Sequence, residues 1–357
     1  MSNEQIMTAL GQFVPAHWAR DPVSAGFVRG ITLTDSALVI KLVLPFVDYQ
    51  LEASLRQLDE QLCKVSGAQT VQWQLSHDVA TLAHAGESQN VGGVRNIIAV
   101  SSGKGGVGKS TTAVNIALAL HQLGARVGIL DADVYGPSIP MMLGVAQSKP
   151  ASDDGKTMAP VSAHGIVANS IGFLVKAGDA TVWRGPMASK ALSQILRETR
   201  WGELDYLIVD LPPGTGDIQL TMAQDVPTTA AIVVTTPQNV ALADAVKGIS
   251  MFRKVNIPVI GVIENMSYHQ CGQCGHQEAL FGEGGGLRAS QEHQVPLIGQ
   301  LPLDASIGRQ MDNGTPTLVA EPDGNLSQLY LTMAARIASG LYFSGNSIPT
   351  RLYTRAV

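Results

Sequence analysis

The sequence has little cysteine, few aromatic residues and no surplus of positive charge. Only three of its 357 residues are cysteine, too few for a disulfide framework, which favours a cytoplasmic protein in a reducing compartment. Aromatic residues make up 5% and the net charge is -5. The composition therefore lacks the basic surface typical of proteins that bind nucleic acid or anionic membranes, and we expect no nucleic-acid partner.

Long apolar runs and a basic leader are also missing. The chain begins MSNEQIMTAL, without a basic segment followed by an apolar one, so no secretory signal is predicted. The best apolar run, 113–120, contains Asn115 and falls short of the roughly 18 residues of a spanning helix. The tail 344–357 has no amphipathic period. We expect neither a membrane span nor a membrane-targeting helix.

A stretch of small and polar residues divides the chain. Residues 83–94 (AHAGESQNVGGV) show no apolar periodicity and predict a linker. Before it, 37–44 and 71–75 have the patterns of strands, and 51–65 has helical apolar spacing. These patterns predict a small α+β domain over residues 1–82.

Residues 95–357 alternate apolar, strand-like runs with helical patterns. Continuous apolar strands separated by helices are typical of an α/β fold, with a doubly wound, mostly parallel sheet covered on both faces. Ligands bind such sheets beyond the carboxyl ends of the strands, so we expect the chemistry in the loops that follow them. The predicted strands are 96–101, 127–130, 206–209, 230–235, 259–263 and 296–301.

A glycine-rich loop follows the first of these strands. The segment GKGGVGKST fits the G-x-x-x-x-G-K-[ST] pattern between a predicted strand and a predicted helix. Backbone N–H groups of such a loop surround phosphate oxygens, so we expect it to bind the phosphates of a nucleotide. Lys109 would reach the β- and γ-phosphates, and the Ser110 hydroxyl would bind Mg²⁺. The predicted nucleotide-binding residues here are Gly103, Lys104, Gly105, Gly106, Val107, Gly108, Lys109, Ser110 and Thr111.

Carboxylates follow two of the later strands. Asp131 and Asp133 lie in DADVYGPS, and Asp210 ends the apolar strand of DYLIVDLPPGTGD. Phosphoryl transfer needs groups that hold Mg²⁺ and position a water, and a strand that delivers Asp210 toward the metal has Walker B geometry. In the turn that follows, the Gly214 amide would be available to a γ-phosphate oxygen. For Asp131 and Asp133 the alternative is that they only cap the next turn.

Cys271 and Cys274 form a C-x-x-C-G motif after the strand 259–263. Glycine permits the tight turn that directs two thiolates at one metal, so the pair is a candidate ligand set. Structural zinc is the alternative, but it usually takes four ligands, and His269 and His276 stand too close to the cysteines for both easily to complete them. Two chains with two thiolates each meet a four-thiolate requirement most simply, which predicts a homodimer.

The loop GKGGVGKS resembles the deviant Walker A loop of ATPases related to MinD, ParA and nitrogenase iron protein. In that class the extra lysine contacts phosphate across a homodimer, which implies this role for Lys104. The resemblance also implies that Asp133 in switch I orients the attacking water, that Asp131 lies near the metal, and that Asn265 recognises adenine. A turn asparagine is the alternative for Asn265. The predicted catalytic residues are Lys104, Lys109, Asp133 and Asp210.

Six motifs in order narrow this resemblance. GKGGVGKS, DADVYGPS, WRGPMASKAL, DLPPGTGD, ENMS and the C-x-x-C occur as in the Mrp/ApbC family of iron–sulfur cluster carriers. The resemblance implies a [4Fe–4S] cluster bridged between two subunits, slow ATP hydrolysis, an unidentified cluster donor and apo iron–sulfur proteins as acceptors. The alternative is a positioning ATPase of the ParA or MinD kind with a structural zinc knuckle.

Residues 1–82 more distantly resemble the SufT/PaaD-like domain of iron–sulfur assembly. Where that family often shows Asp-Pro-Glu, this chain has Asp21, Pro22 and Val23, and Cys63 falls in a predicted helix. We expect Cys63 to be buried in the core of this domain, as free cysteines usually are.

Overall fold

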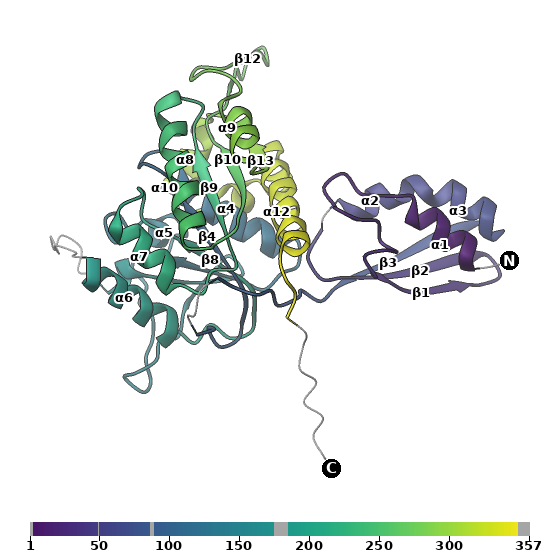
Figure 1. Cartoon of the computed structure of the whole chain (residues 1–357), viewed down its shortest axis with the longest axis horizontal. Coiled ribbons are helices and arrows are strands. Elements are labelled where there is room, and N and C mark those ends of the chain that lie inside the picture. The colour runs from purple at the N-terminus through teal and green to yellow at the C-terminus, as the bar shows by residue number, and fades with distance from the viewer. Residues whose placement is uncertain (1–2, 49, 86–88, 175–184, 349–357) are drawn as a thin grey trace.

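Two domains lie side by side in the computed structural model, which describes residues 3–48, 50–85, 89–174 and 185–348 (Figure 1). The smaller domain is N-terminal, and the larger one contains the glycine-rich loop and the cysteine motif. Trp183 and Arg184 of the WRGPMASKAL motif and the end of the tail lie outside the described residues.

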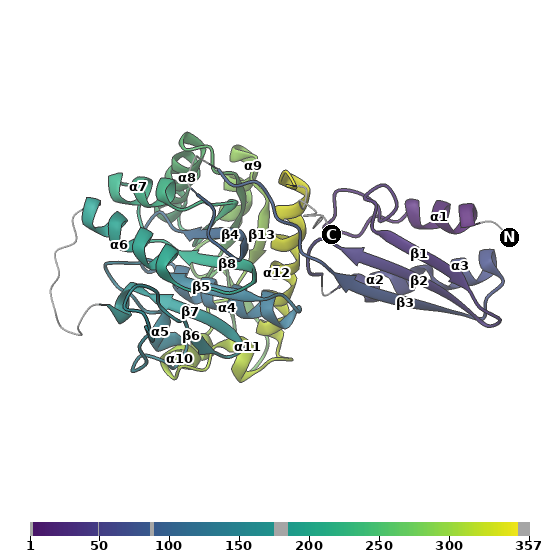
Figure 2. The same ribbon diagram turned by 90° about the horizontal axis from the view of Figure 1, so that it is seen from below.

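The N-terminal domain is a three-stranded sheet with its helices on one face (Figures 1 and 2). The central strand β2 (Ala37–Leu44) is antiparallel to β1 (Val28–Leu33) and parallel to β3 (Thr70–His77). Both predicted strands are confirmed, whereas β1 was not predicted. The helices are α1 (Asn3–Gly11), α2 (Leu51–Leu55), the 3-10 turn η1 (Arg56–Leu58) and α3 (Asp59–Ser66).

Cys63 lies on α3, as predicted, but it is only half-buried. The buried side of this helix is formed by Leu62 and Ser66, so the prediction of a core cysteine was wrong. The helix turns Cys63 away from that buried side because neighbouring helical residues point in different directions.

The larger domain contains an eight-stranded sheet in the order β13-β10-β9-β4-β8-β5-β7-β6, parallel except for β6. The predicted α/β fold with a mostly parallel sheet is confirmed, and β6 and β7 are additions to it. The strands are β4 (Val94–Ser101), β5 (Val127–Asp131), β6 (Val161–Ala163), β7 (Ile166–Ser170), β8 (Leu204–Asp210), β9 (Ala230–Thr235), β10 (Val259–Glu264) and β13 (Leu297–Gln300).

Helices cover both faces of this sheet. On β4, Ile98 and Val100 belong to the core that includes α4 and α12, while Ile97 and Ala99 belong to the core that includes α6, α7 and α8. Burial of both faces explains why the strands are continuously apolar. The helices are α4 (Lys109–Gln122), α5 (Ile139–Met142), the 3-10 turn η2 (Ile171–Phe173), α6 (Gly185–Glu198), α7 (Asp217–Asp225), α8 (Asn239–Lys254), α9 (Gly285–His293), α10 (Ala305–Asp312), α11 (Thr317–Ala320) and α12 (Asn325–Ser344).

The predicted linker, 83–94, is bonded to the larger domain where the structure describes it. The Ala83 amide donates to the Asn346 carbonyl at 2.8 Å, and the Ala85 amide donates to the Thr228 carbonyl at 2.9 Å. The Val91 side chain is buried in the core beneath α6 and α8. These contacts attach the segment to the surface of the larger domain, which its small and polar residues did not indicate.

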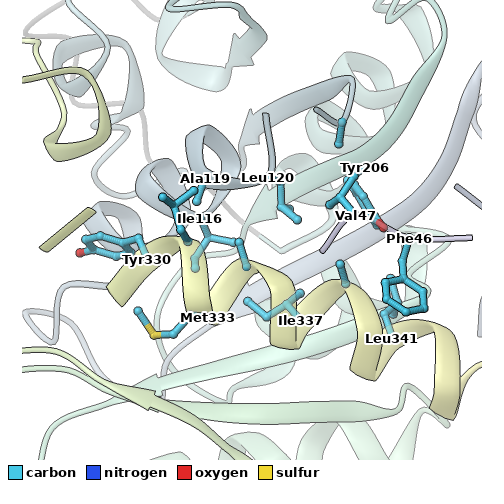
Figure 3. Packing of buried hydrophobic residues seen from close by; sticks show 14 of the residues in the cluster. Phe46, Val47, Ile116, Ala119, Leu120, Tyr206, Tyr330, Met333, Ile337 and Leu341 are labelled. Carbon is cyan, nitrogen blue, oxygen red and sulfur yellow. The ribbon is translucent and has the colours of Figure 1, made fainter. Parts of the chain in front are cut away.

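Helix α12 connects the two domains. Figure 3 shows Ile116 of α4 against one side of this helix and Leu341 beside Phe46 of the N-terminal domain, while Met333 points to the opposite side, where it packs against Gly299 of β13. At the same seam the Trp18, Phe27 and Phe46 rings pack against Phe343, with ring centroids 5.6 to 6.3 Å apart. One helix therefore contacts both the helix of the glycine-rich loop and the N-terminal domain.

Candidate functional site

The glycine-rich loop joins β4 to α4 and packs closely against two other elements. Gly108 is the N-cap of α4 in a left-handed conformation with φ 83°. A Cβ at Gly108 would lie 2.1 Å from Nδ2 of Asn265, and one at Gly103 would lie 2.2 Å from the backbone of Asp244 in α8. Only glycine allows these approaches. The predicted strand–loop–helix arrangement is confirmed.

Lys109, Ser110 and Asp210 meet at the start of α4. The Lys109 ammonium donates to Oδ1 of Asp210 at 2.6 Å, and the Ser110 hydroxyl donates to Oδ2 at 2.6 Å. Asp210 is fully buried at the end of β8, and Lys109 is only 6% exposed. Burial raises the pKa of Asp210, and the adjacent ammonium opposes part of that rise. Every charge at this point has a partner within the chain.

Asp131 and Asp133 extend the same cluster in different ways. Oδ2 of Asp133 lies 3.6 Å from the Lys109 ammonium. The Asp131 carboxylate instead accepts hydrogen bonds from the Ile139 amide at 3.1 Å and the Ser170 hydroxyl at 3.0 Å. Burial, with repulsion from Asp210, raises the pKa of Asp131 to about 7. Asp131 thus shapes the DADVYGPS loop, while Asp133 faces the lysine.

Lys104 lies in the glycine-rich loop, and Gly214 lies in the turn after β8 that is hydrogen-bonded to the start of this loop. The Gly214 amide donates to the Ser102 carbonyl at 2.8 Å, so a contact with phosphate requires this bond to be exchanged. The Ser102 hydroxyl donates to the Lys104 carbonyl at 2.8 Å. The half-buried Lys104 side chain has no ion pair with any residue that the structure describes. It differs in this from Lys109.

Asn265 lies directly against the phosphate loop, after β10. Its side-chain amide donates to the Val107 carbonyl at 2.9 Å, and only 8% of the residue is exposed. Glu264, its neighbour, is a buried carboxylate that the sequence analysis missed. The available signal was a charged residue closing the apolar strand VIGVIE, where the loop chemistry of a parallel sheet is found.

The two cysteines lie on a hairpin that projects from the larger domain, formed by β11 (His269–Gln270) and β12 (Gln277–Glu278) (Figure 1). The Cys271 amide donates to the His276 carbonyl and the Gly275 amide donates to the Cys271 carbonyl, both at 2.9 Å. Cys271 is half-buried and Cys274 is exposed. Hydrogen bonds from the Cys274 and Gln273 amides lower the pKa of the Cys271 thiol. The hairpin therefore presents two thiols outward.

One chain supplies no complete metal site within its described ranges. No group of three or more His, Cys, Asp or Glu side chains is placed there to hold a metal ion. Nδ1 of His269 lies 3.3 Å from the Leu303 carbonyl oxygen. Among the described helices, none is long and apolar enough to span a membrane.

Comparison with known proteins identifies the family to which the chain is similar. Residues 93–338 match the family model described as NUBPL iron-transfer P-loop NTPase. The iron-sulfur cluster carrier protein of Escherichia coli is 53% identical over 324 residues, covering 90% of this chain and 88% of the relative. The protein of the same description from Haemophilus influenzae is 48% identical over 354 residues, covering 99% and 96%.

Solved structures of similar fold include a nucleotide-binding protein and a cell-division ATPase. The nucleotide-binding protein of Archaeoglobus fulgidus in complex with ADP, in which cobalt was found, is 37% identical with a TM-score of 0.58, covering 66% of this chain and 92% of that one. The cell-division ATPase MinD of Pyrococcus furiosus, at 21% identity and a TM-score of 0.52, covers 68% of this chain and 98% of its own, and supports the fold alone. The chain belongs to the NUBPL-type iron-transfer P-loop NTPases, the Mrp/ApbC group that its motifs resemble.

Proposed function

We propose that this protein is an iron–sulfur cluster carrier that binds a [4Fe–4S] cluster between two subunits and passes it to apo-proteins, with ATP binding and slow hydrolysis. The observation that carries the proposal is the projecting hairpin with Cys271 and Cys274 on a phosphate-loop ATPase domain. Relatives at 53% and 48% identity named iron-sulfur cluster carrier protein support it.

The number of thiols explains why two chains are needed. A [4Fe–4S] cluster is usually held by four thiolates, and each hairpin offers two. A two-fold arrangement brings the same pair from each chain to one axis. The lowered pKa of Cys271 favours the thiolate that binds iron. Exposure of Cys274 lets the thiolates of an acceptor approach the cluster, which suits release rather than permanent storage.

The nucleotide site suits Mg²⁺ and ATP. The Ser110 hydroxyl and the Asp210 carboxylate are oxygen donors of the kind that Mg²⁺ prefers, and these two residues would hold it beside the phosphates. The metal would neutralise charge on the phosphates when bound. Lys109 would exchange Asp210 for phosphate oxygens, and Asp133 would orient the attacking water. Lys104, without an ion pair among the described residues, would reach the nucleotide of the partner subunit.

Anaerobic reconstitution with iron and sulfide tests the proposal. Wild type should hold about four iron and four sulfide per dimer, with the mass of a dimer in solution. Cys271→Ala and Cys274→Ala should each lose the cluster and its transfer to an apo-acceptor, but keep reduced ATP turnover. Cys63→Ala is the matched control, because Cys63 is half-buried in the other domain, and it should retain the cluster.

Three results would contradict this proposal. A monomer with a full cluster would remove the need for two chains. Loss of the cluster in Cys63→Ala would place a ligand in the N-terminal domain. Stoichiometric zinc without sulfide would instead favour a structural knuckle in a positioning ATPase.

A further inference from the structure

A buried carboxylate lies between the phosphate loop and the cysteine hairpin. Glu264 ends β10 and is 1% exposed. Its Oε1 accepts hydrogen bonds from the Ser267 hydroxyl at 2.8 Å and the Gln300 side-chain amide at 2.7 Å. Its Oε2 accepts from the backbone amide of Gly286. A buried carboxylate needs such donors, and here three different segments supply them.

Two of those donors, Ser267 and Gly286, flank the longer segment that contains the cysteine hairpin. Ser267 precedes β11, and Gly286 lies in the first turn of α9, which follows β12. A Cβ at Gly286 would lie 2.8 Å from Oε2 of Glu264, so glycine is needed for this approach. The positive end of the helix dipole of α9 also favours a carboxylate there. One side chain thus holds both ends of the segment that carries Cys271 and Cys274.

The adjacent residues connect this carboxylate to the phosphate loop. Asn265 donates from its side chain to the Val107 carbonyl at 2.9 Å. Between Asn265 and Ser267, Met266 adopts a left-handed backbone with φ 56°, which is unfavourable for a residue with a side chain. Contacts on both sides of Met266 hold it there, because the Ser267 amide also donates to the Leu301 carbonyl at 2.8 Å.

We propose that Glu264 is a positioning residue that makes the orientation of the cysteine hairpin depend on the nucleotide state of the phosphate loop. The proposal rests on the proposed function of the hairpin. When the loop closes around phosphates, movement at Val107 is passed through Asn265 to Glu264 and Ser267. Because Glu264 binds both ends of the segment 267–286, which contains the hairpin, the two ends move together and the thiols change their accessibility as a pair.

Thiol alkylation of the cluster-free protein measures this dependence. The full chain is treated with iodoacetamide under anaerobic conditions without nucleotide, with Mg-ADP and with a non-hydrolysable Mg-ATP analogue. Mass spectrometry of peptides gives a separate rate for each cysteine. Cys63, in the other domain, is the internal reference for reagent and pH. In wild type, nucleotide should change the rates at Cys271 and Cys274 by about fivefold, the lower end of typical coupling factors, and leave Cys63 unchanged.

Three variants distinguish a positioning role of Glu264 from a nonspecific structural effect of the substitutions. Glu264→Gln keeps the shape but replaces one oxygen with an amide group that faces other donors, so the response should fall below about twofold while nucleotide binding persists. Ser267→Ala removes the hydrogen bond to Glu264 at one end of the segment only, and it should at least halve the change in alkylation rate that nucleotide causes. Glu278→Gln makes the same charge change on the exposed strand β12, without touching the Glu264 contacts, and should respond as wild type.

The outcomes decide the proposal. It is overturned if wild-type thiols react equally in all nucleotide states, or if a folded Glu264→Gln protein keeps the full response. Should Glu264→Gln not fold, an undiminished response in Ser267→Ala overturns it. Alkylation needs no cluster, so its result is separate from the iron and sulfide content that tests the proposed function.

Discussion

The phosphate loop and the cysteine hairpin place their reactive groups in opposite ways. Lys109 is 6% exposed and bonds to a fully buried Asp210, so one chain supplies and satisfies this set of charges. The hairpin leaves Cys274 exposed and supplies two thiols. The difference shows that the charges at the start of α4 are paired within one chain, whereas the described residues place no third metal-binding side chain beside the two cysteines.

Breaking the buried pair should have the largest effect. Lys109→Ala leaves the Asp210 carboxylate buried without its cation, which should lower the free energy of unfolding by about 3–5 kcal/mol and abolish Mg²⁺-dependent ATP hydrolysis. Urea unfolding and phosphate release measure the two effects. Lys64→Ala is the matched control: it removes an exposed lysine from α3, and its unfolding midpoint and hydrolysis should match wild type. Wild-type hydrolysis in a folded Lys109→Ala protein would refute the site.

A second test uses the raised pKa of Asp131, about 7 against an ordinary 3.8. Between these values the folded chain binds more protons than the unfolded one, so this group makes stability fall as pH rises. Wild type without nucleotide should therefore lose stability relative to Asp131→Asn by up to about 1.4 kcal/mol per pH unit in this window. Urea unfolding at a series of pH values gives the free energy of unfolding of both proteins. If it changes with pH by the same amount in both, the pKa of Asp131 is an ordinary one.

A substitution at Lys104 should have a smaller effect, and it tests whether this lysine acts on the nucleotide of the partner subunit or on that of its own chain. Lys104→Ala should weaken ATP-dependent dimer closure by about tenfold, the value of one charge-assisted hydrogen bond, and weaken ATP binding to a single chain much less. Light scattering and nucleotide titration measure the two quantities. Lys247→Ala, which removes an exposed lysine from α8, is the control. Equal losses in both measurements would mean that Lys104 acts within its own chain.

The smallest effect is expected at the hairpin. Cys271→Ala and Cys274→Ala should leave the unfolding midpoint of the cluster-free protein at the wild-type value, because the hairpin packs few of its residues into either core. A clear fall in the midpoint would show that the thiols have a structural role in the single chain. Thermal unfolding of the three proteins side by side measures this.

The sequence predicts the strand–loop–helix arrangement around the glycine-rich loop because its parts are local. Asp210 ends a recognisable strand, Lys109 and Asp133 follow two others, and parallel strands bring their carboxyl ends together. The strand β7 was missed since it contains the polar Asn169, whose side chain donates to the Thr199 hydroxyl at 2.8 Å. A buried partner thirty residues away leaves no local pattern.

The domain seam and the Glu264 contacts escape the sequence for the same reason. Trp18 and Phe343 lie at opposite ends of the chain, with ring centroids 6.0 Å apart, and neither indicates the other. Ser267, Gly286 and Gln300 are ordinary polar or small residues until folding brings them to one carboxylate. Contacts between distant residues depend on the completed topology rather than on any period in the sequence.

The hydrogen bonds from Ser267 and Gly286 to Glu264, on either side of the cysteine hairpin, have a consequence for engineering. The segment between Ser267 and Gly286 is a replaceable module, because its attachment points are set by residues that lie outside its ligand-bearing part. Loop-closure entropy grows slowly with length, so longer hairpins with other ligand sets can be grafted between these points at small cost to folding. We therefore expect the larger domain to keep its fold when this one surface insert is exchanged for another.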